Sequence, residues 1–569
     1  MKKITRYVDH LRIRNSPAQP GARHQAQVSL PYSSTAPPSP PLPTHPGSPT
    51  LTNSRSKGSL ITHARRWIGK KFRRRCMSFA VLPVTLLTDS MRCTVGLVDM
   101  LPDDALLVIF DFCAHQLGGW KEDIEAWQIL VHVCRRWRIL VFASPRRLNL
   151  RLVCAANTPA RDALDVWPDL PLIIQCDLIR IGHMDNIVAV LERNNRVCQI
   201  SLPEVSSSEL EKVSAAMQVP FPELTRLILS SKEKPVAVLP NPFLGGSGPC
   251  LQYISFYGIP FPGLPKLLLS ATHLADLRLF NIPHSGYIPP EEMVTILSTL
   301  LSLGHLLPQF QSPRSCPDRE SRRPPPQSRF VLPVLRHFQF KGATEYLDDL
   351  VACIHAPRLD NFGIEFFNDI VFDTPQLIQF ISRTPTLLDA LDSADVSFGG
   401  LVPGASVRFS SEHFQRIDVH ISCGGLDWQV SSVEQVCTSC LPFIFTLETL
   451  YITAGQYGRP EQNDNVENTQ WLELLHPFTA VKKLYLSEEV ARRFVPALQE
   501  LEGGSTTEVL PALENIFLEG SVLEGIGQFA VTRQVAGHSI AVSRWEHSPN
   551  PSPSLETLMP KNGFQVVYD

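Results

Sequence analysis

The sequence lacks any apolar run long enough to cross a membrane. In its 569 residues, no stretch reaches the roughly 18–20 consecutive apolar residues that a membrane-spanning helix needs. The opening MKKITRYVDH has no apolar core after its charges, which a secretory signal would require. We therefore expect no membrane partner and no secretory leader, and a location in the cytoplasm or the nucleus.

The sequence also lacks the motifs of the common catalytic and cofactor sites. There is no GxxxxGK[ST] phosphate loop, no GxSxG nucleophile turn and no HExxH metal site. The 13 cysteines form no dense framework, and most of them, such as Cys113 and Cys353, lie inside apolar runs. Cysteine used as a small apolar residue is typical of a reducing compartment. These absences predict a protein that is not an enzyme and holds no cofactor.

One group of residues has the spacing of a zinc site. Cys437 and Cys440 form a CxxC pair, and His420 and Cys423 precede it as H-x2-C. However, His420 and Cys423 are three residues apart on an expected strand, so their side chains point to opposite faces. The pair also lacks a thioredoxin-like context, and we predict neither a metal site nor a redox site here.

Charge and proline are distributed unevenly. Residues 1–75 carry 15 basic side chains and a single acid, Asp9, which leaves 37 basic and 54 acidic residues in the rest, a net charge of −17. Residues 29–49 form a Pro/Ser/Thr tract that cannot build a core, and residues 64–76 form a basic run. We expect residues 1–97 to be a disordered tail whose basic run is a nuclear-import patch, an acidic-surface contact or a solvated linker. The acidic body argues against nucleic-acid binding there.

Residues 101–143 predict two or three short helices. Pro102 suits a first helical turn, and Asp103 and Asp104 place negative charge at the helix N-terminus. Apolar residues then recur at helical spacing, first as Leu106, Ile109, Phe110 and Cys113, and again from about residue 123 as Trp127, Leu130, Val133, Cys134 and Trp137. About 45 residues cannot bury this much apolar surface among themselves, so the segment predicts a partner.

The same segment resembles an F-box, the helical motif that docks a protein onto a ubiquitin-ligase scaffold. An opening Leu-Pro pair, Leu101-Pro102, is followed by a V-C-x-x-W segment, residues 133–137, after an unusually long spacer. The resemblance implies that eight side chains contact a Skp-type SCF adaptor or support that contact: Leu101, Pro102, Leu106, Ile109, Phe110, Val133, Cys134 and Trp137. The alternative is that these helices only cap the segment that follows.

From residue 148 onward, a short apolar motif recurs that resembles the L-x-x-L-x-L core of a leucine-rich repeat. It appears at 221–230, 250–258, 273–282, 332–342, 356–367, 414–423, 446–454, 480–488 and 511–520, with a degraded copy at 303–310. Neighbouring copies are often 23 to 34 residues apart, at or above the period of such repeats. Helix-like stretches lie between them at 208–217, 290–301, 374–382 and 490–501. Each unit is therefore strand, loop and helix.

The predicted fold is α/β. A helical F-box at 98–145 precedes a leucine-rich-repeat-like solenoid, a horseshoe with a parallel sheet on its concave side, at 146–546. A proline-rich loop is inserted at 312–328, and residues 547–569 form a C-terminal tail. Strand residues that alternate with the core would line the concave side, among them Arg226, Arg278, Gln339 and Lys483. These four are either substrate contacts or merely solvated.

An F-box ahead of such repeats is similar to the arrangement of fungal SCF substrate receptors, especially those of mushroom-forming species. The resemblance implies a substrate-recognition subunit of an E3 ubiquitin ligase, with the F-box on the adaptor and the repeats on a substrate protein. A repeat scaffold that binds a partner protein without a ligase is the alternative.

Overall fold

The computed structural model describes residues 101–116, 127, 130–131, 133–145, 147–155, 164, 169–176, 184–231, 236–312, 328–367, 374–388, 391–399, 404–411, 414–439, 441, 443–454, 466–500, 509–520 and 523–545. The expected tails at 1–97 and 547–569 lie outside these residues, as do Cys440 and most of the expected loop at 312–328.

The described residues form an α/β fold, which confirms the predicted class. Sixteen strands make one mostly parallel sheet in the order β1-β2-β3-β4-β5-β6-β7-β9-β11-β14-β13-β12-β15-β16-β17-β18, and β8 and β10 form a small second sheet. The strands of the large sheet are β1 (Leu152–Cys154), β2 (Leu172–Gln175), β3 (Val197–Val205), β4 (Arg226–Ser231), β5 (Tyr253–Tyr257), β6 (Asp276–Ile282), β7 (His305–Phe310), β9 (His337–Gly342), β11 (Asn361–Phe366), β12 (Ser393–Phe398), β13 (Ala405–Ser411), β14 (Phe414–Ile421), β15 (Thr449–Ala454), β16 (Lys483–Leu486), β17 (Asn515–Glu519) and β18 (Ala541–Trp545). The small sheet pairs β8 (Phe330–Val331) with β10 (Ile354–His355).

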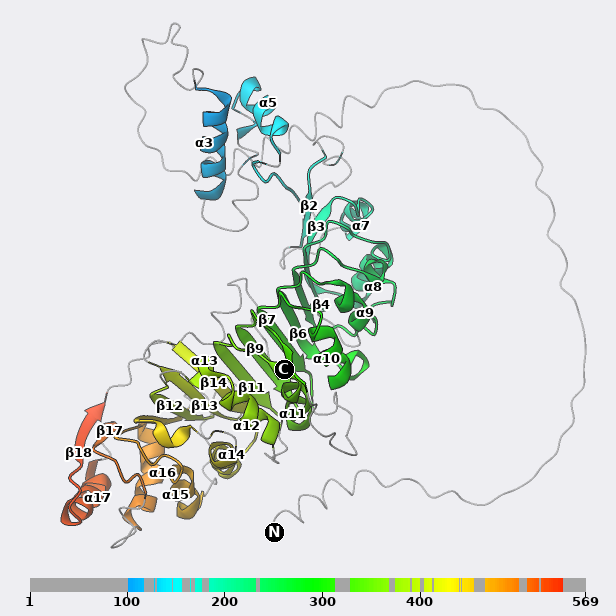
Figure 1. Cartoon of the computed structure of the whole chain (residues 1–569). Coiled ribbons are helices and arrows are strands. Elements are labelled where there is room, and N and C mark those ends of the chain that lie inside the picture. Colours follow the sequence, from blue (N-terminus) through cyan, green and yellow to red (C-terminus); the bar gives the residue numbers. More distant parts are fainter. Residues whose placement is uncertain are drawn as a thin grey trace, which may run out of the picture. The chain divides into compact units, whose positions relative to one another are not determined.

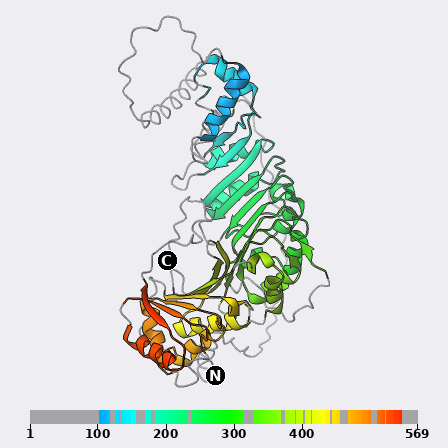
Figure 2. The same ribbon diagram turned by 60° about the vertical axis from the view of Figure 1, so that its left-hand side comes forward.

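Of the α-helices whose bounds lie within the described residues, two precede the sheet and the others connect its strands. The first two are α3 (Asp103–Gln116) and α5 (Arg135–Ala143). The connecting helices are α7 (Met184–Leu191), α8 (Ser207–Ala216), α9 (Leu264–Ser270), α10 (Pro290–Leu297), α11 (Thr344–Ala352), α12 (Pro375–Ser382), α13 (Pro385–Leu388), α14 (Leu426–Ser439), α15 (Asn468–Leu475), α16 (Glu488–Gln499) and α17 (Leu523–Val535). Most of these helices lie side by side along one face of the sheet (Figures 1 and 2).

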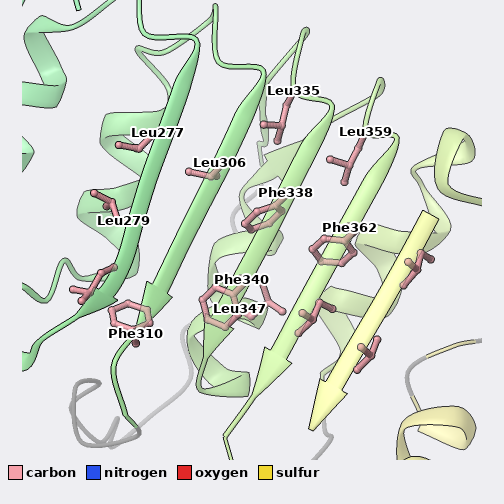
Figure 3. Close-up of a cluster of buried hydrophobic side chains, with 14 of the residues drawn as sticks. Leu277, Leu279, Leu306, Phe310, Leu335, Phe338, Phe340, Leu347, Leu359 and Phe362 are labelled. Atoms are coloured by element: carbon pink, nitrogen blue, oxygen red, sulfur yellow. The ribbon is translucent and has the colours of Figure 1, made fainter. Parts of the chain in front are cut away.

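Alternation along each strand explains this one-sided layer. In β9, Phe338 and Phe340 are buried and Gln339 between them is only half-buried. Successive side chains of a strand point to opposite faces, so the apolar set faces the helices and the polar set faces away. Figure 3 shows the buried set on neighbouring strands. Parallel register places these side chains in one row across four strands: Leu277, Leu306, Phe338 and Phe362.

The predicted repeat motifs coincide with strands. Each of the nine motif ranges contains one strand of the large sheet, from β4 in 221–230 to β17 in 511–520, and the degraded copy contains β7. The helix-like stretches coincide with α8, α10, α12 and α16. The sheet also extends further toward the N-terminus than these motifs, through β1, β2 and β3.

The expectation of an all-parallel sheet is wrong at one place. Strand β13 runs antiparallel to both β12 and β14, and β12 pairs with β15 instead of β14. A parallel pair needs a crossover of about a dozen residues, and the links of six and two residues on either side of β13 are too short for one. The chain therefore enters this region at β12, returns through β13 to β14 beside β11, and crosses back by α14 to β15.

We expect the buried row to dominate stability. Phe338→Ala removes a fully buried ring between Leu306 and Phe362 and should cost about 3–5 kcal/mol, because the cavity adds to the lost apolar burial. Gln339→Ala, one residue away on the other face of β9, is the matched control and should cost less than about 1 kcal/mol. Urea unfolding followed by circular dichroism measures both. Equal shifts of the unfolding midpoint would contradict the two-faced sheet.

Candidate functional site

Helix α3 begins where the sequence predicts. The Leu106 amide donates to the Pro102 carbonyl at 3.1 Å, so Pro102 lies just before the first turn, where its missing N–H costs nothing. Asp103 and Asp104 occupy that turn and complement the partial positive charge of the helix N-terminus. Leu106 and Phe110 are fully buried, one turn apart on the inner face of α3.

The second half of residues 101–143, which we call the helical unit, contains a helix with a side-chain cap at its N-terminus. Cys134 is the N-cap of α5, and its Sγ accepts a bond from the Trp137 amide at 3.4 Å. The Trp137 ring lies on Phe110 of α3, with ring centroids 4.6 Å apart. The V-C-x-x-W segment therefore has two structural roles: Cys134 caps the N-terminus of α5, and Trp137 packs α5 against α3.

The helical pattern from about residue 123 has a break before α5, in a segment where two or three short helices were expected. Trp127 and Leu130 are helical, but Val131 and Val133 lie in turns before α5 starts at Arg135. The side-chain cap of Cys134 explains the new start, because a capped N-terminus needs extended backbone at the cap residue. The Arg138 Nε donates to the Val131 carbonyl at 2.9 Å and satisfies the backbone at this break.

Arg136 ties the two motif halves together. Its guanidinium donates to the Leu101 carbonyl at 2.6 Å and forms an ion pair with Asp103 at 2.7 Å. Arg136 is thus bonded on both sides of Pro102, and it fixes the angle at which the chain enters α3. In the sequence, Arg136 occupies only a spacer position of the V-C-x-x-W pattern, and nothing in the pattern indicates this role.

Two contacts join the helical unit to the start of the sheet. The Trp127 indole Nε1 donates to the Arg151 carbonyl at 2.9 Å, directly before β1. The Arg147 guanidinium pairs with Asp104 at 3.0 Å, although both side chains are largely exposed. An exposed ion pair contributes little to stability, so the indole bond and the shared apolar core carry this connection.

Five large apolar side chains of residues 101–143 are exposed to solvent. Val108, Ile109 and Phe112 are 60%, 42% and 62% exposed, and their spacing places them on one face of α3. Val133 before α5 and Ile139 within it are 56% and 59% exposed. These five are a third of the 15 large apolar side chains that are exposed among the described residues. We call them the apolar surface of the helical unit.

The side chains of the eight predicted adaptor contacts differ in how far they are buried. Pro102, Ile109 and Val133 are exposed, Leu101, Cys134 and Trp137 are partly buried, and Leu106 and Phe110 belong to the core. The buried pair can support a contact but not make one. Val108, Phe112 and Ile139 are exposed as well but were not among the predicted contacts, because the apolar pattern of this segment does not distinguish its outward face from its inward face.

The open face of the sheet, opposite the helices, carries the four predicted substrate contacts. The Arg226 guanidinium lies 3.9 Å from the Tyr253 ring centroid, and that of Arg278 lies 5.4 Å from the same centroid. Arg278 also donates two bonds of 2.8 Å to Asp276. Gln339 and Lys483 lie on the same face but six strands apart, roughly 30 Å at the usual strand spacing. The structure brings Arg226 and Arg278 together, and not the other two.

Two histidines stack on this face between the arginines and Gln339. His305 of β7 and His337 of β9 are register neighbours with ring centroids 4.6 Å apart. Burial lowers the pKa of His305, where Asp276 opposes the shift and Arg278 adds to it. Burial and the neighbouring His305 lower the pKa of His337, where Asp360 and Asp276 oppose the shift and Arg336 adds to it. In both rings the shift of the pKa favours the neutral imidazole.

The residues with zinc-like spacing are only partly described, because Cys440 lies outside the described residues. His420 belongs to β14, Cys423 follows that strand, and Cys437 is buried in α14. Burial raises the pKa of the Cys423 thiol, which disfavours the thiolate that a metal would need. Within the described ranges, no three His, Cys, Asp or Glu side chains gather as metal ligands.

In the part of the chain that the structure describes, no helix combines the length and the apolar character that spanning a membrane requires. No protein-family model matches the chain, and a search of curated proteins finds no significantly similar sequence.

We expect Arg136→Ala to loosen the start of α3. It removes the bonds to Asp103 and the Leu101 carbonyl, worth about 1 kcal/mol after discounting for solvent screening. Hydrogen exchange of the Leu106 and Leu107 amides should accelerate about fivefold, because their opening becomes that much more frequent. Arg135→Ala, at the exposed neighbouring position, is the control. Unchanged exchange in Arg136→Ala would show that Arg136 does not fix this turn.

We expect acid to destabilise the sheet through His337. The pKa of His337 in the folded state lies below the ordinary value of 6.5. The contribution of His337 to the unfolding free energy is therefore complete above about pH 6.5, and it is lost as the pH falls below that value, because the unfolded chain takes up the proton more readily. His337→Gln should therefore narrow the difference in unfolding free energy between about pH 7.5 and pH 5. His273→Gln, at an exposed position, controls for the loss of an imidazole. If the unfolding free energy of His337→Gln fell as much between about pH 7.5 and pH 5 as that of the parent protein, His337 would not be a source of the acid sensitivity.

Proposed function

We propose that this chain is the substrate-recognition subunit of an SCF-type E3 ubiquitin ligase. Residues 101–143 act as its F-box and dock a Skp-type adaptor. The α/β array that follows is a leucine-rich-repeat solenoid of the horseshoe kind, and its open sheet face binds a substrate protein. The observation that carries the proposal is the apolar surface of the helical unit, directly ahead of the sheet.

The apolar surface supports an adaptor contact because a solvent-exposed patch of this kind is costly for a protein without a partner. Phe112, Ile109 and Val108 offer the aromatic and aliphatic anchors that protein interfaces favour. They lie on one face of a helix, which fits the binding of a helix face in an apolar groove. The rigid packing of Trp137 on Phe110 limits the ordering cost of such a contact.

The proposed role requires no chemistry from the chain itself. A receptor of this class holds a substrate near the catalytic subunits and so raises its effective concentration there. We accordingly propose that the protein is not an enzyme, and that it acts in the cytoplasm or the nucleus, where such ligases assemble.

The second candidate is a repeat scaffold whose helices only cap the array. The bond from the Trp127 indole to the Arg151 carbonyl and the Arg147–Asp104 pair favour it, since both join the helical unit to the start of the sheet. A cap, however, needs apolar side chains that face the array. It gives no reason for Val108, Ile109 and Phe112 to be exposed on the outside.

Adaptor binding distinguishes the two candidates. The full chain should capture a purified Skp-type adaptor in a pull-down, and Ile109→Asp with Phe112→Asp should weaken capture at least about 100-fold, because both charges would be buried in the contact. Leu301→Asp, at an apolar position 58% exposed outside the helical unit, is the matched control and should bind like the parent protein.

A second pair of changes tests the two motif halves. Pro102→Ala with Trp137→Ala should also abolish capture, while circular dichroism and the thermal unfolding midpoint report whether the sheet remains folded. Failure of the intact protein to bind the adaptor would contradict the receptor proposal, and the repeat scaffold would then be the remaining candidate.

A further inference from the structure

The open face of the sheet becomes aromatic over its last four strands. Tyr451 of β15, Tyr485 of β16, Phe517 of β17 and Trp545 of β18 form what we call the aromatic row. Tyr485 stacks on Tyr451 and on Phe517, with centroids 4.4 Å apart in both pairs. The Trp545 ring crosses Tyr485 at 74° with centroids 5.4 Å apart, so it lies against ring edges rather than within the stack.

These rings are not part of the core. The residues on either side of Tyr485, Leu484 and Leu486, are fully buried under the helices, whereas the four rings are partly exposed on the opposite face. Elsewhere on this face, charged side chains pair with each other, as in Arg278–Asp276, 2.8 Å, and Lys341–Glu365, 2.6 Å. Large rigid aromatic side chains on an accessible face are what protein-binding sites concentrate.

Acidic groups flank the aromatic row at both ends. Burial raises the pKa of the Tyr451 hydroxyl, and the nearby Tyr485, Asp392 and Asp395 add to that shift. Glu519 is the register neighbour of Trp545 at the other end. Lys483 is on the same face, two residues before Tyr485. The chain beyond residue 75 carries a net charge of −17, although residues 1–75 bring that of the whole chain to −3, so the charge of this part favours a cationic segment.

The same face shows how it receives a cation. On β4, β5 and β6, the guanidinium groups of Arg226 and Arg278 both lie near the Tyr253 ring, at 3.9 Å and 5.4 Å from its centroid. Arg278 is held there by the carboxylate of Asp276. An aromatic ring with a nearby carboxylate is thus already a guanidinium site on this sheet, and cation–π attraction is strongest for Trp and Tyr.

We propose that the aromatic row is a docking site for a protein segment that carries arginine or lysine. The cationic side chain lies over a ring face that the stack leaves open, because both faces of Tyr485 are covered by Tyr451 and Phe517. Glu519, beside Trp545, compensates its charge. This inference rests on the proposed function in one respect only, since it makes that segment part of the substrate. The site itself requires no ligase.

The test is a selection of random 12-residue peptides displayed on phage against the full chain. Peptides that also bind a Tyr451→Thr, Phe517→Thr variant are removed; threonine suits a strand but has no ring. We expect the remaining peptides to be enriched in arginine or lysine. For a synthetic copy of one selected peptide, changing its cationic residue to glutamine should weaken binding about tenfold, measured by fluorescence anisotropy.

Two charge variants leave the rings in place. Glu519→Gln, which keeps an oxygen to accept the Glu488 amide bond, should weaken binding of that peptide about threefold. Lys483→Glu should strengthen it by a similar factor, because it replaces a like charge beside the site. Opposite signs for these two changes, with unaltered thermal midpoints, distinguish recognition from a change in folding.

Several outcomes would overturn the inference. Selected peptides rich in proline or purely apolar, or no enrichment at all, would each assign this face to another partner or to none. The Tyr451→Thr, Phe517→Thr variant should still capture the adaptor. A chain that selects basic peptides but binds no adaptor would keep the docking site and lose the ligase role. A chain that binds the adaptor but selects no basic peptides would keep the ligase role and lose the docking site.

Discussion

Each strand–helix unit of this chain has an apolar strand face that it cannot bury by itself. The row that begins with Leu277 and passes through Leu306 and Phe338 to Phe362 exists only because the strands lie in register beside each other. Burial of that row selects the face on which the helices lie, and it leaves the opposite face of every strand without core contacts. The buried row therefore determines which face of the sheet stays accessible, although the side chains of that row are themselves inaccessible.

The open face has to satisfy its own polar groups, and it does so in two different ways. Over β4 to β12, arginines, lysines and acids pair with one another, and the stacked imidazoles of His305 and His337 lie among them. Over β15 to β18, the rings of the aromatic row stack instead. The change follows the insertion of β13, where the chain doubles back and the strand order departs from the sequence order. The two parts of the face thus offer different chemistry to a partner.

The helical unit obeys the same constraint on a smaller scale. Its interior includes Leu106, Phe110 and part of the Trp137 ring, and a unit of about 45 residues leaves other apolar side chains outside. Arg136 fixes the approach of α3 to α5 with hydrogen bonds rather than with further burial. The unit can consequently keep a defined shape while Ile109 and Phe112 remain available on its surface.

The sequence by itself determined the α/β class, the positions of the repeated strands and the start of α3, because these depend on local periodicity and capping. Pro102 and Asp103, for example, specify a helix N-terminus wherever the segment lies. Only the tertiary structure decided that β13 runs antiparallel, that Arg136 bridges Leu101 and Asp103, and that Tyr451, Tyr485, Phe517 and Trp545 gather on one face. These relations join residues far apart along the chain through strand register and packing, and no spacing in the sequence encodes which side of an apolar helix meets solvent.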